Sequence, residues 1–257
     1  MTVKDPGFHI IVPARYQASR LPGKPLLDIG GKPMIQHVVE RCKESAARSV
    51  VVATDSRRIT DAVESFGGEA VLTAPDHPSG SDRIAEASSL LGIEDGEIIV
   101  NVQGDEPDMS ARLINQLVEG LVNDEVAAMA TASAPLDHEA QLADPAVVKV
   151  VCDQSGHAMY FSRAPIPWVR DSGSSCPAEN AGSHVSRHLG IYAYRAGFLR
   201  KYARMKRPVL EELEKLEQLR VLWHGHKILC LEAVVIPDPG IDTPEDLTAA
   251  RKKYGSL

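Results

Sequence analysis

Short apolar segments rich in β-branched residues alternate with amphipathic segments along the first half of the chain, and this alternation constrains the fold more than any other feature. The apolar segments predict strands at 8–14, 49–54, 69–73, 97–103 and 127–134. The patterns between them include predicted helices at 33–45 and 58–66. Strands and helices that alternate at this pace form βαβ units with right-handed crossovers. We therefore predict an α/β fold with a mostly parallel central sheet flanked by helices.

The pattern changes after residue 135, where regular helices no longer separate the strands. Strand-like segments follow at 147–152, 157–162 and 188–195. A charged helix at 208–223, a strand at 227–236 and a last helix beginning at Thr243 complete the chain. We predict one domain, 1–257, with a βαβ half at 8–135 and a smaller mixed α+β half at 136–257.

Composition excludes several classes of partner. The net charge of -7 argues against nucleic acid, which requires a broad basic face. No apolar run approaches the roughly 20 residues of a membrane helix, and we expect neither a signal peptide nor a membrane partner. Cys42, Cys152, Cys176 and Cys230 form no CxxC pair, which favours reduced thiols in a cytoplasmic protein.

The loop after the first predicted strand gathers three cations in this acidic chain. Arg15, Arg20 and Lys24 lie there without an acidic neighbour, and neither glycine-rich phosphate-binding fingerprint is present. Long side chains could supply the positive charge for a small anion. The alternative is a solvated turn made by Pro22 and Pro25. The loop alone leaves both readings open.

Two acidic positions are candidate magnesium ligands. Asp105 follows the strand at 97–103, where a carboxylate can hold Mg²⁺ against a triphosphate or belong to an ordinary polar turn. Asp242 precedes the last helix, and Thr243 with Asp246 resembles a capping box that leaves Asp242 unexplained. Ser79 and Gly80 precede another predicted helix. They either bind a base or an anion through backbone N–H groups or simply cap that helix.

Eight segments, in order, closely resemble the 3-deoxy-manno-octulosonate (Kdo) cytidylyltransferase family, the CMP-Kdo synthetases. They are PARYQASRLPGKPL, VATD, HPSGSDR, VNVQGDEP, YFSRAPIPW, RHLGIYAYR, LEKLEQLRVLW and IDTPEDL, and they span about residues 8 to 250. The first segment alone resembles the wider group of sugar nucleotidyltransferases, whereas RHLGIY and LEQLR resemble the Kdo branch of that group. Asp108 departs from the apolar residue expected after GDEP.

The resemblance implies a Rossmann-like nucleotidyltransferase fold, CTP and Kdo as substrates, Mg²⁺, a homodimer, and CMP-Kdo made for lipopolysaccharide in the cytoplasm. The 8–135 half would bind the nucleotide, and the 136–257 half would bind the sugar and dimerise. The implied nucleotide-binding residues are Pro13, Ala14, Arg15, Arg20, Lys24, Thr54, Asp55, Ser79, Gly80 and Arg83. The implied sugar-binding residues are Gln103, Arg163, His188, Tyr192, Glu217 and Gln218. Asp105 and Asp242 would hold the metal and act in catalysis with Arg15 and Lys24.

These residue types suit attack of the Kdo anomeric hydroxyl on the α-phosphorus of CTP. Catalysis would consist of positioning and charge neutralisation, and we assign no general base. Alternatives are transfer to another acidic sugar, either sialic acid or an amino analogue of Kdo, and a CTP-binding module without turnover. A CTP-binding module without turnover would be expected to lack one of the metal-binding carboxylates, yet Asp105 and Asp242 are both present. An NAD-dependent dehydrogenase is disfavoured because GxGxxG is absent after the first strand.

Overall fold

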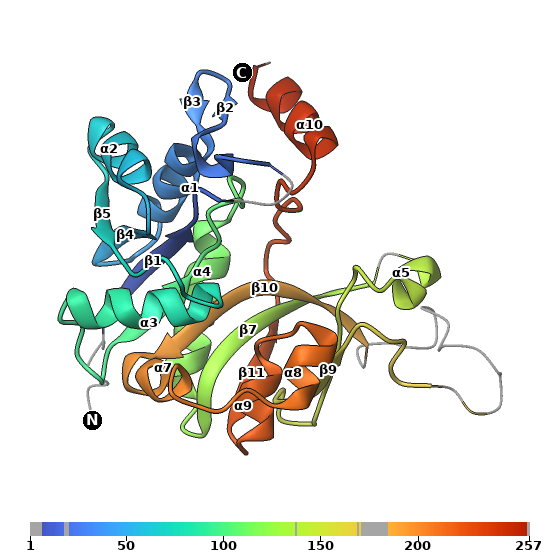
Figure 1. The fold of residues 1–257 in the computed structure, drawn as a ribbon. Coiled ribbons are helices and arrows are strands. Elements are labelled where there is room, and N and C mark those ends of the chain that lie inside the picture. The colour runs from blue at the N-terminus through green and yellow to red at the C-terminus, as the bar shows by residue number, and fades with distance from the viewer. Residues whose placement is uncertain (1–6, 18–20, 137, 169, 171–184, 256–257) are drawn as a thin grey trace. The chain divides into compact units, whose positions relative to one another are not determined.

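The computed structural model describes residues 7–17, 21–136, 138–168, 170 and 185–255 (Figure 1). The chain forms two compact units that interleave along the sequence. The first unit comprises Met1–Asn115, Arg195–Ala203 and Val235–Leu257, and the second comprises Gln116–Tyr194 and Arg204–Val234. The division of one domain into halves at residue 135 stays a prediction.

A parallel sheet forms the centre of the first unit. Its strands are β1 (Phe8–Ala14), β4 (Ser49–Thr54), β5 (Glu69–Leu72) and β6 (Ile98–Asn101), in the order β6-β1-β4-β5. Each neighbouring pair is parallel, and Ile10 on β1 lies in register with Val50 on one side and Val100 on the other. All three of these side chains are buried, as expected for a sheet covered on both faces. The predicted α/β fold with a mostly parallel sheet is confirmed.

The first unit also contains helices and a short hairpin. The helices are α1 (Met34–Lys43), α2 (Arg57–Ser65), α3 (Gly80–Leu90), α7 (Ala196–Tyr202) and α10 (Pro244–Gly255), with a 3₁₀ turn η1 (Lys24–Leu26). The hairpin pairs β2 (Asp28–Ile29) with β3 (Lys32–Pro33), and α10 packs against it (Figure 1). The chain passes from the first unit to the second within α4 (Ala111–Asn123).

Asp108, the residue that departs from the expected apolar type, joins α10 to the segment after β6 within the first unit. The Tyr254 hydroxyl donates a 2.8 Å hydrogen bond to Asp108 Oδ1, and Lys253 Nζ lies 2.8 Å from the same oxygen. Burial, followed by the hydrogen bond and charge of Asp108, raises the pKa of Tyr254 to about 12. The polar residue therefore has a structural role beside the helix that follows Asp242.

The second unit contains a mixed sheet. Its strands are β7 (Ala127–Pro135), β8 (Lys149–Cys152), β9 (Ala158–Ser162), β10 (Ser186–Arg195) and β11 (Lys227–Glu232). β7 lies between β11, which is parallel to it, and β10, which is antiparallel. β8 pairs antiparallel with both β10 and β9. The helices are α5 (Glu139–Ala143), α8 (Val209–Glu214) and α9 (Leu219–Trp223).

The predicted helix at 208–223 is wrong, because the chain breaks there into α8 and α9. Lys215 has a left-handed backbone with φ of 54° and ends α8. Arg220 Nε donates a 2.8 Å hydrogen bond to Glu211 Oε2 across nine residues, and both side chains are buried. In one continuous helix that separation is about two and a half turns and puts the two residues on opposite faces. The break brings the ion pair together.

The structure also tests the predictions for the last strand and for the start of the last helix. The strand predicted at 227–236 ends earlier, at Glu232. The capping box at the last helix is confirmed, because Asp246 N donates to Thr243 Oγ1 and Thr243 N donates to Asp246 Oδ2.

Within the ranges that the structure describes, no helix combines the length and apolar character needed to cross a membrane.

Candidate functional site

A pocket of about 220 Å³ lies in the first unit beyond the carboxyl ends of β1 and β6. Ligands of parallel sheets bind at this edge, because the loops that follow the strands converge there. The pocket therefore collects the loop after β1, the loop after β6 and the start of α3. Its lining residues are Pro13, Ala14, Arg15, Gln17, Lys24, Pro25, Gly80, Gln103, Gly104 and Asp105.

Lys24 lies between two carboxylates at this pocket. Its Nζ donates to Asp105 Oδ2 at 2.5 Å and to Asp242 Oδ1 at 2.8 Å. Asp105 comes from the loop after β6 and Asp242 from the segment before α10. The two segments are joined by a 2.9 Å hydrogen bond from Ile241 N to the Asp105 carbonyl. The structure thus brings together three of the four residues predicted to act in catalysis.

The donor set fits a magnesium ion that also binds phosphate. Asp105 and Asp242 already converge on one positive group, the ammonium of Lys24. No cluster of three or more His, Cys, Asp or Glu side chains suited to a metal occurs among the residues described. Mg²⁺ is commonly held by only one or two carboxylates, with phosphate oxygens and water completing its octahedron. Two carboxylates beside a pocket for phosphate meet that requirement.

Arg15, the fourth predicted catalytic residue, lines the same pocket. One of its terminal nitrogens, Nη2, donates to the His77 carbonyl at 2.5 Å. A guanidinium carries five N–H donors, so this bond fixes the side chain and leaves further donors for a ligand. Arg20 lies outside the described residues.

Glu106, the acid beside Asp105 in GDEP, is a second carboxyl group in the loop after β6. Burial, and secondarily the negative charge of Asp105, raises its pKa to about 8. Its Oε2 is buried and has no hydrogen-bond partner among the described residues. A neutral Glu106 at pH 7 keeps a third negative charge away from Lys24. Its only sequence signal is its place after Asp105 in GDEP.

Asp55 and Arg83, which were predicted to bind the nucleotide, form an ion pair with each other. Arg83 is fully buried, and its Nη2 donates to Asp55 Oδ2 at 3.1 Å. Its Nη1 donates to Thr73 Oγ1 and to the Ala74 carbonyl. Burial lowers the pKa of Arg83, and Asp55 opposes that effect. The pair therefore braces the loop before α3, and its contact with a nucleotide stays a prediction.

Thr54 and Ser79 also have protein partners. The Thr54 Oγ1 accepts a hydrogen bond from Ser56 N, and Ser79 Oγ caps α3 by accepting one from Asp82 N. Gly80 forms part of the pocket lining, and a Cβ atom there would meet the Pro13 ring at 3.4 Å. At Ser79 the capping alternative accounts for the side chain, while Gly80 keeps the pocket wall close to β1.

Five of the six predicted sugar-binding residues lie in the second unit. Gln103 is the exception, and its Nε2 donates to Asn101 Oδ1 at 3.2 Å in the first unit. The other five are Arg163, His188, Tyr192, Glu217 and Gln218. Glu217 lies in the turn between α8 and α9, where its carbonyl accepts a hydrogen bond from Arg220 N.

His188 is a neutral imidazole. Burial lowers its pKa to about 3, and its ring lies edge-on to Phe161 at 5.0 Å between centroids. Its Nε2 is 2.9 Å from Thr131 Oγ1, and that hydroxyl donates to the Ile191 carbonyl at 2.7 Å. Since the hydroxyl has one proton, hydrogen-bond balance assigns the imidazole proton to Nε2. Nδ1 is then an acceptor.

Gln218 carries a spare buried donor. The Tyr192 hydroxyl donates to Gln218 Oε1 at 3.1 Å, which fixes the orientation of the amide. The other atom of that amide, Nε2, is buried without a partner in the described part of the chain. An unpaired buried donor costs roughly 1–3 kcal/mol, so its presence indicates a site for an acceptor such as a ligand hydroxyl.

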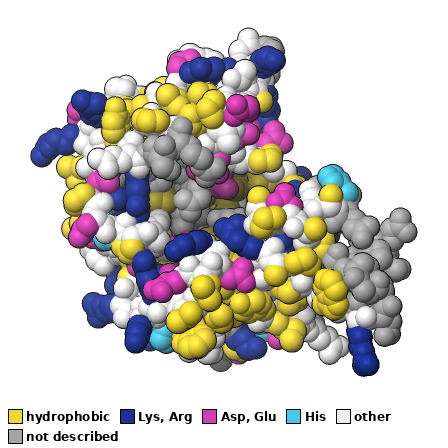
Figure 2. All heavy atoms as spheres, turned by 45° about the vertical axis from the view of Figure 1, so that its right-hand side comes forward, with side chains coloured by type: hydrophobic (Ala, Val, Ile, Leu, Met, Phe, Trp, Pro, Cys, Tyr) yellow, Lys and Arg dark blue, Asp and Glu magenta, His cyan; other side chains and the backbone are white. Residues whose placement is uncertain are grey.

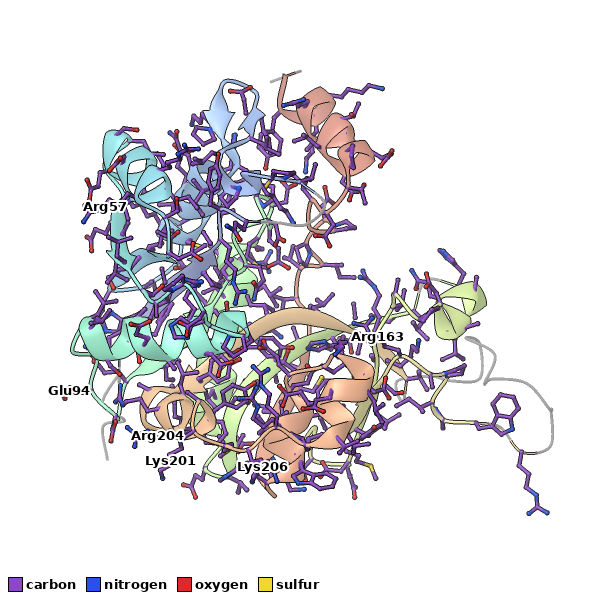
Figure 3. The ribbon with its side chains drawn as sticks, in the orientation of Figure 1. Arg57, Glu94, Arg163, Lys201, Arg204 and Lys206 are labelled. Atoms are coloured by element: carbon purple, nitrogen blue, oxygen red, sulfur yellow. The ribbon has the colours of Figure 1, made fainter. Side chains whose placement is uncertain are left out.

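Arg163 is held at the end of β9 beside α8 (Figure 3). Its Nε donates to the Glu214 carbonyl at 2.7 Å and its Nη1 to the Pro145 carbonyl at 2.8 Å. Lys149, a buried residue absent from the prediction, donates to three main-chain carbonyls, one of which belongs to Arg163. Burial lowers the pKa of Lys149. Only the structure shows that Lys149 positions this segment.

The chain is similar to known cytidylyltransferases. A cytidylyltransferase family model matches residues 9–228. The 3-deoxy-manno-octulosonate cytidylyltransferases of Idiomarina loihiensis and Photobacterium profundum are each 51% identical over 96% of this chain, covering 98% and 99% of those proteins. The enzyme of that name from Halorhodospira halophila is 51% identical over 99% of both chains.

Two solved structures extend the similarity. A CMP:2-keto-3-deoxy-manno-octonic acid synthetase complexed with CTP is 41% identical, has a TM-score of 0.88, and is matched over 97% of this chain and 99% of that chain. A cytidylyltransferase from Leptospira borgpetersenii, 19% identical with a TM-score of 0.60, is matched over 97% of this chain and 87% of its own, and shares the fold. With relatives so close over nearly its whole length, the chain belongs to the 3-deoxy-manno-octulosonate cytidylyltransferase family.

Proposed function

We propose that the protein transfers CMP from CTP to the anomeric hydroxyl of Kdo, releasing pyrophosphate and forming CMP-Kdo. The observation that carries the proposal is the meeting of Lys24 with Asp105 and Asp242 at a pocket that Arg15 also lines. Cationic donors suit a triphosphate, and paired carboxylates suit a divalent cation. Family membership supplies the identity of the two substrates.

In the reaction, the anomeric oxygen of Kdo forms a bond to the α-phosphorus of CTP. The bond from that phosphorus to the oxygen bridging to the β-phosphate breaks, and pyrophosphate leaves with the electron pair. Arg15 and Lys24 donate hydrogen bonds to the phosphates and stabilise the developing negative charge. The proton of the anomeric hydroxyl passes to solvent. Held by Asp105 and Asp242, Mg²⁺ would supply further positive charge to the phosphate oxygens.

The second unit supplies groups that suit an acidic sugar. The other terminal nitrogen of Arg163, Nη2, has no hydrogen bond among the described residues, and such a donor suits a carboxylate. Gln218 Nε2 is a donor and His188 Nδ1 an acceptor for hydroxyl groups. This mixture fits Kdo, which carries one carboxylate and several hydroxyls.

A substrate panel tests the assignment. Purified protein is given CTP and Mg²⁺ with Kdo, an amino analogue of Kdo or sialic acid, and pyrophosphate release is measured. We expect release with Kdo, and release that requires Mg²⁺. Release with sialic acid but not Kdo would overturn the substrate, and no release with any acidic sugar would leave only a CTP-binding module.

We further propose a homodimer formed through the second unit. Figure 2 shows hydrophobic side chains gathered in the lower part of the view. On α8, Val209 and Leu213 are 63% and 73% exposed one helical turn apart, and on the adjoining α9 Trp223 is 60% exposed. Large apolar side chains exposed on two adjoining helices are consistent with an interaction surface, which we propose is the dimer interface. Light scattering should give the dimer mass for the native protein and the monomer mass for Leu213→Asp.

CMP-Kdo is an activated sugar, which suits a sugar donor. We propose that the protein supplies it for lipopolysaccharide assembly and works in the cytoplasm. Loss of the encoding gene should then deplete CMP-Kdo in cell extracts while free Kdo accumulates. Unchanged CMP-Kdo would contradict this role.

A further inference from the structure

One positive group occupies the point on which both candidate metal ligands converge. Lys24 Nζ lies within 2.8 Å of Asp242 Oδ1 and closer still to Asp105 Oδ2. Charge-assisted hydrogen bonds from ammonium to carboxylate have about this length. Mg²⁺ requires its ligand oxygens at about 2.0–2.1 Å. An ammonium and a divalent cation held by the same two oxygens at such short distances would repel each other strongly.

We propose that Lys24 is the resident cation of the metal position in the free protein, and that a divalent cation gains Asp105 and Asp242 only when the ammonium moves away. The inference rests on the proposed function, since it assumes that the two carboxylates bind a metal. It adds that Lys24 has two alternating partners. In the free protein the partners are the carboxylates, and with substrate bound they are the phosphates.

The surroundings of Lys24 permit this exchange. The Lys24 side chain is 11% exposed, whereas those of Asp105 and Asp242 are 32% and 53% exposed. A cation can therefore approach the carboxylates from solvent while the lysine lies on the protein side. Lys24 and Arg15 both line the pocket of about 220 Å³, so space for the displaced ammonium lies next to its present position.

The exchange has an energetic consequence. A metal that arrives alone must break two ion pairs and leave a largely buried ammonium without a partner, which is costly. A triphosphate that arrives with the metal supplies new acceptors for that ammonium. The free protein should therefore bind a divalent cation weakly, and Lys24 should be the cause.

Mn²⁺ binding to the full chain without nucleotide tests the proposal, with unbound Mn²⁺ measured by electron paramagnetic resonance. Lys24→Met keeps the length of the side chain and removes its charge, so it should bind Mn²⁺ about ten-fold more tightly or better. Lys32→Met is the matched control, because Lys32 pairs with the single carboxylate of Glu40 and is 45% exposed. Its Mn²⁺ affinity should equal that of the native protein.

A double variant tests whether the added Mn²⁺ affinity comes from the two carboxylates. Lys24→Met combined with Asp105→Asn should lose the added affinity, because one of the two carboxylates is gone. Circular dichroism melting checks that each variant folds, and Lys24→Gln replaces Lys24→Met if that variant does not. The expected result is tighter binding in the neutral Lys24 variant alone.

Three results would overturn the proposal: equal or weaker Mn²⁺ binding by the neutral Lys24 variant, an equal gain in Lys32→Met, or a gain that survives Asp105→Asn. Failure of the proposed function is a separate result. It would be seen as absence of pyrophosphate release by the native protein with CTP, Mg²⁺ and Kdo, whatever the Mn²⁺ affinities are.

Discussion

The two clusters of predicted site residues differ in how their polar groups are satisfied. In the first unit, Lys24 neutralises Asp105 and Asp242, so the charges of the cluster are partners of one another. In the second unit, His188 is a neutral imidazole, and Gln218 Nε2 is a buried donor that has no hydrogen-bond partner among the described residues. A site of mutually paired charges must exchange partners when ligand binds. Neutral groups such as the Gln218 amide and the His188 imidazole can hydrogen-bond a sugar hydroxyl without exchanging charged partners.

This difference assigns different tasks to the two clusters. Nucleotidyl transfer moves negative charge from the α-phosphorus to pyrophosphate, and cationic groups stabilise that movement. Recognition of a sugar depends on hydrogen bonds, whose loss leaves buried groups unpaired. We therefore expect substitutions in the first cluster to reduce turnover, and substitutions in the second to weaken sugar binding.

The largest expected effect concerns a charge pair in the second unit that has no part in either cluster. Arg220 and Glu211 are both buried, and Arg220→Met leaves the Glu211 carboxylate without its principal partner. We expect the free energy of unfolding to fall by about 3–5 kcal/mol. Urea unfolding measures it. A loss under about 1 kcal/mol would show that this pair does not hold α8 against α9.

Asp105→Asn should give the next largest effect, on turnover. The substitution removes one charge from the cluster, and we expect pyrophosphate release to fall by about 100- to 1,000-fold with little change in melting temperature. Asp95→Asn is the control, since Asp95 pairs with Arg200 on the surface of the same unit. Equal activity losses in the two variants would break the distinction between site charges and surface charges.

Gln218→Met tests whether the cluster in the second unit binds the sugar. The methionine keeps the size of the side chain but removes both the acceptor for Tyr192 and the spare donor. KM for Kdo should rise about ten-fold, while KM for CTP stays unchanged. Gln116→Met is the control, because the Gln116 amide bonds only to main-chain groups near Glu232 in the contacts described. A rise in KM for CTP instead would contradict the assignment of this cluster to the sugar.

The smallest expected effect is a pH dependence of stability from His188. Its pKa is about 3 in the folded protein against an ordinary 6.5, so between these values the unfolded chain binds the additional proton. Stability from the neutral imidazole is complete above pH 6.5 and falls as pH decreases, by no more than about 1.4 kcal/mol at about pH 5.5. The stability of His188→Gln should fall less over this range. An identical pH profile in both proteins would contradict a neutral His188.

The sequence predicted the sheet of the first unit well, because β-branched segments fix strands such as Phe8–Ala14 and Ser49–Thr54 with little dependence on tertiary context. It failed at 208–223, where leucines and charged residues favour a continuous helix. The break at Lys215 is decided by the pairing of Glu211 with Arg220, which helical periodicity cannot reveal. Local pattern is decisive only where no distant contact opposes it.

The same limit applies to the candidate site. The rule that ligands bind beyond strand ends brought Lys24 and Asp105 to one edge. Asp242 was a candidate ligand because the capping box left it unexplained, and the family resemblance supported it. Their direct pairing could not be predicted, since it joins residues 81 and 218 positions apart. Arg83 shows the opposite case, because its motif indicated nucleotide binding while its buried partner is Asp55. Side-chain partners over such separations become visible only in the folded chain.

The central claim is that the protein moves CMP from CTP to Kdo at the Lys24 cluster, and phosphorus NMR of one reaction mixture tests it most directly. With native protein, CTP, Mg²⁺ and Kdo, the α-phosphorus signal of CTP should convert to the phosphodiester of CMP-Kdo, with an equal amount of pyrophosphate. With Asp105→Asn, CTP should persist. Pyrophosphate without the sugar phosphodiester, or unchanged conversion by Asp105→Asn, would contradict the account.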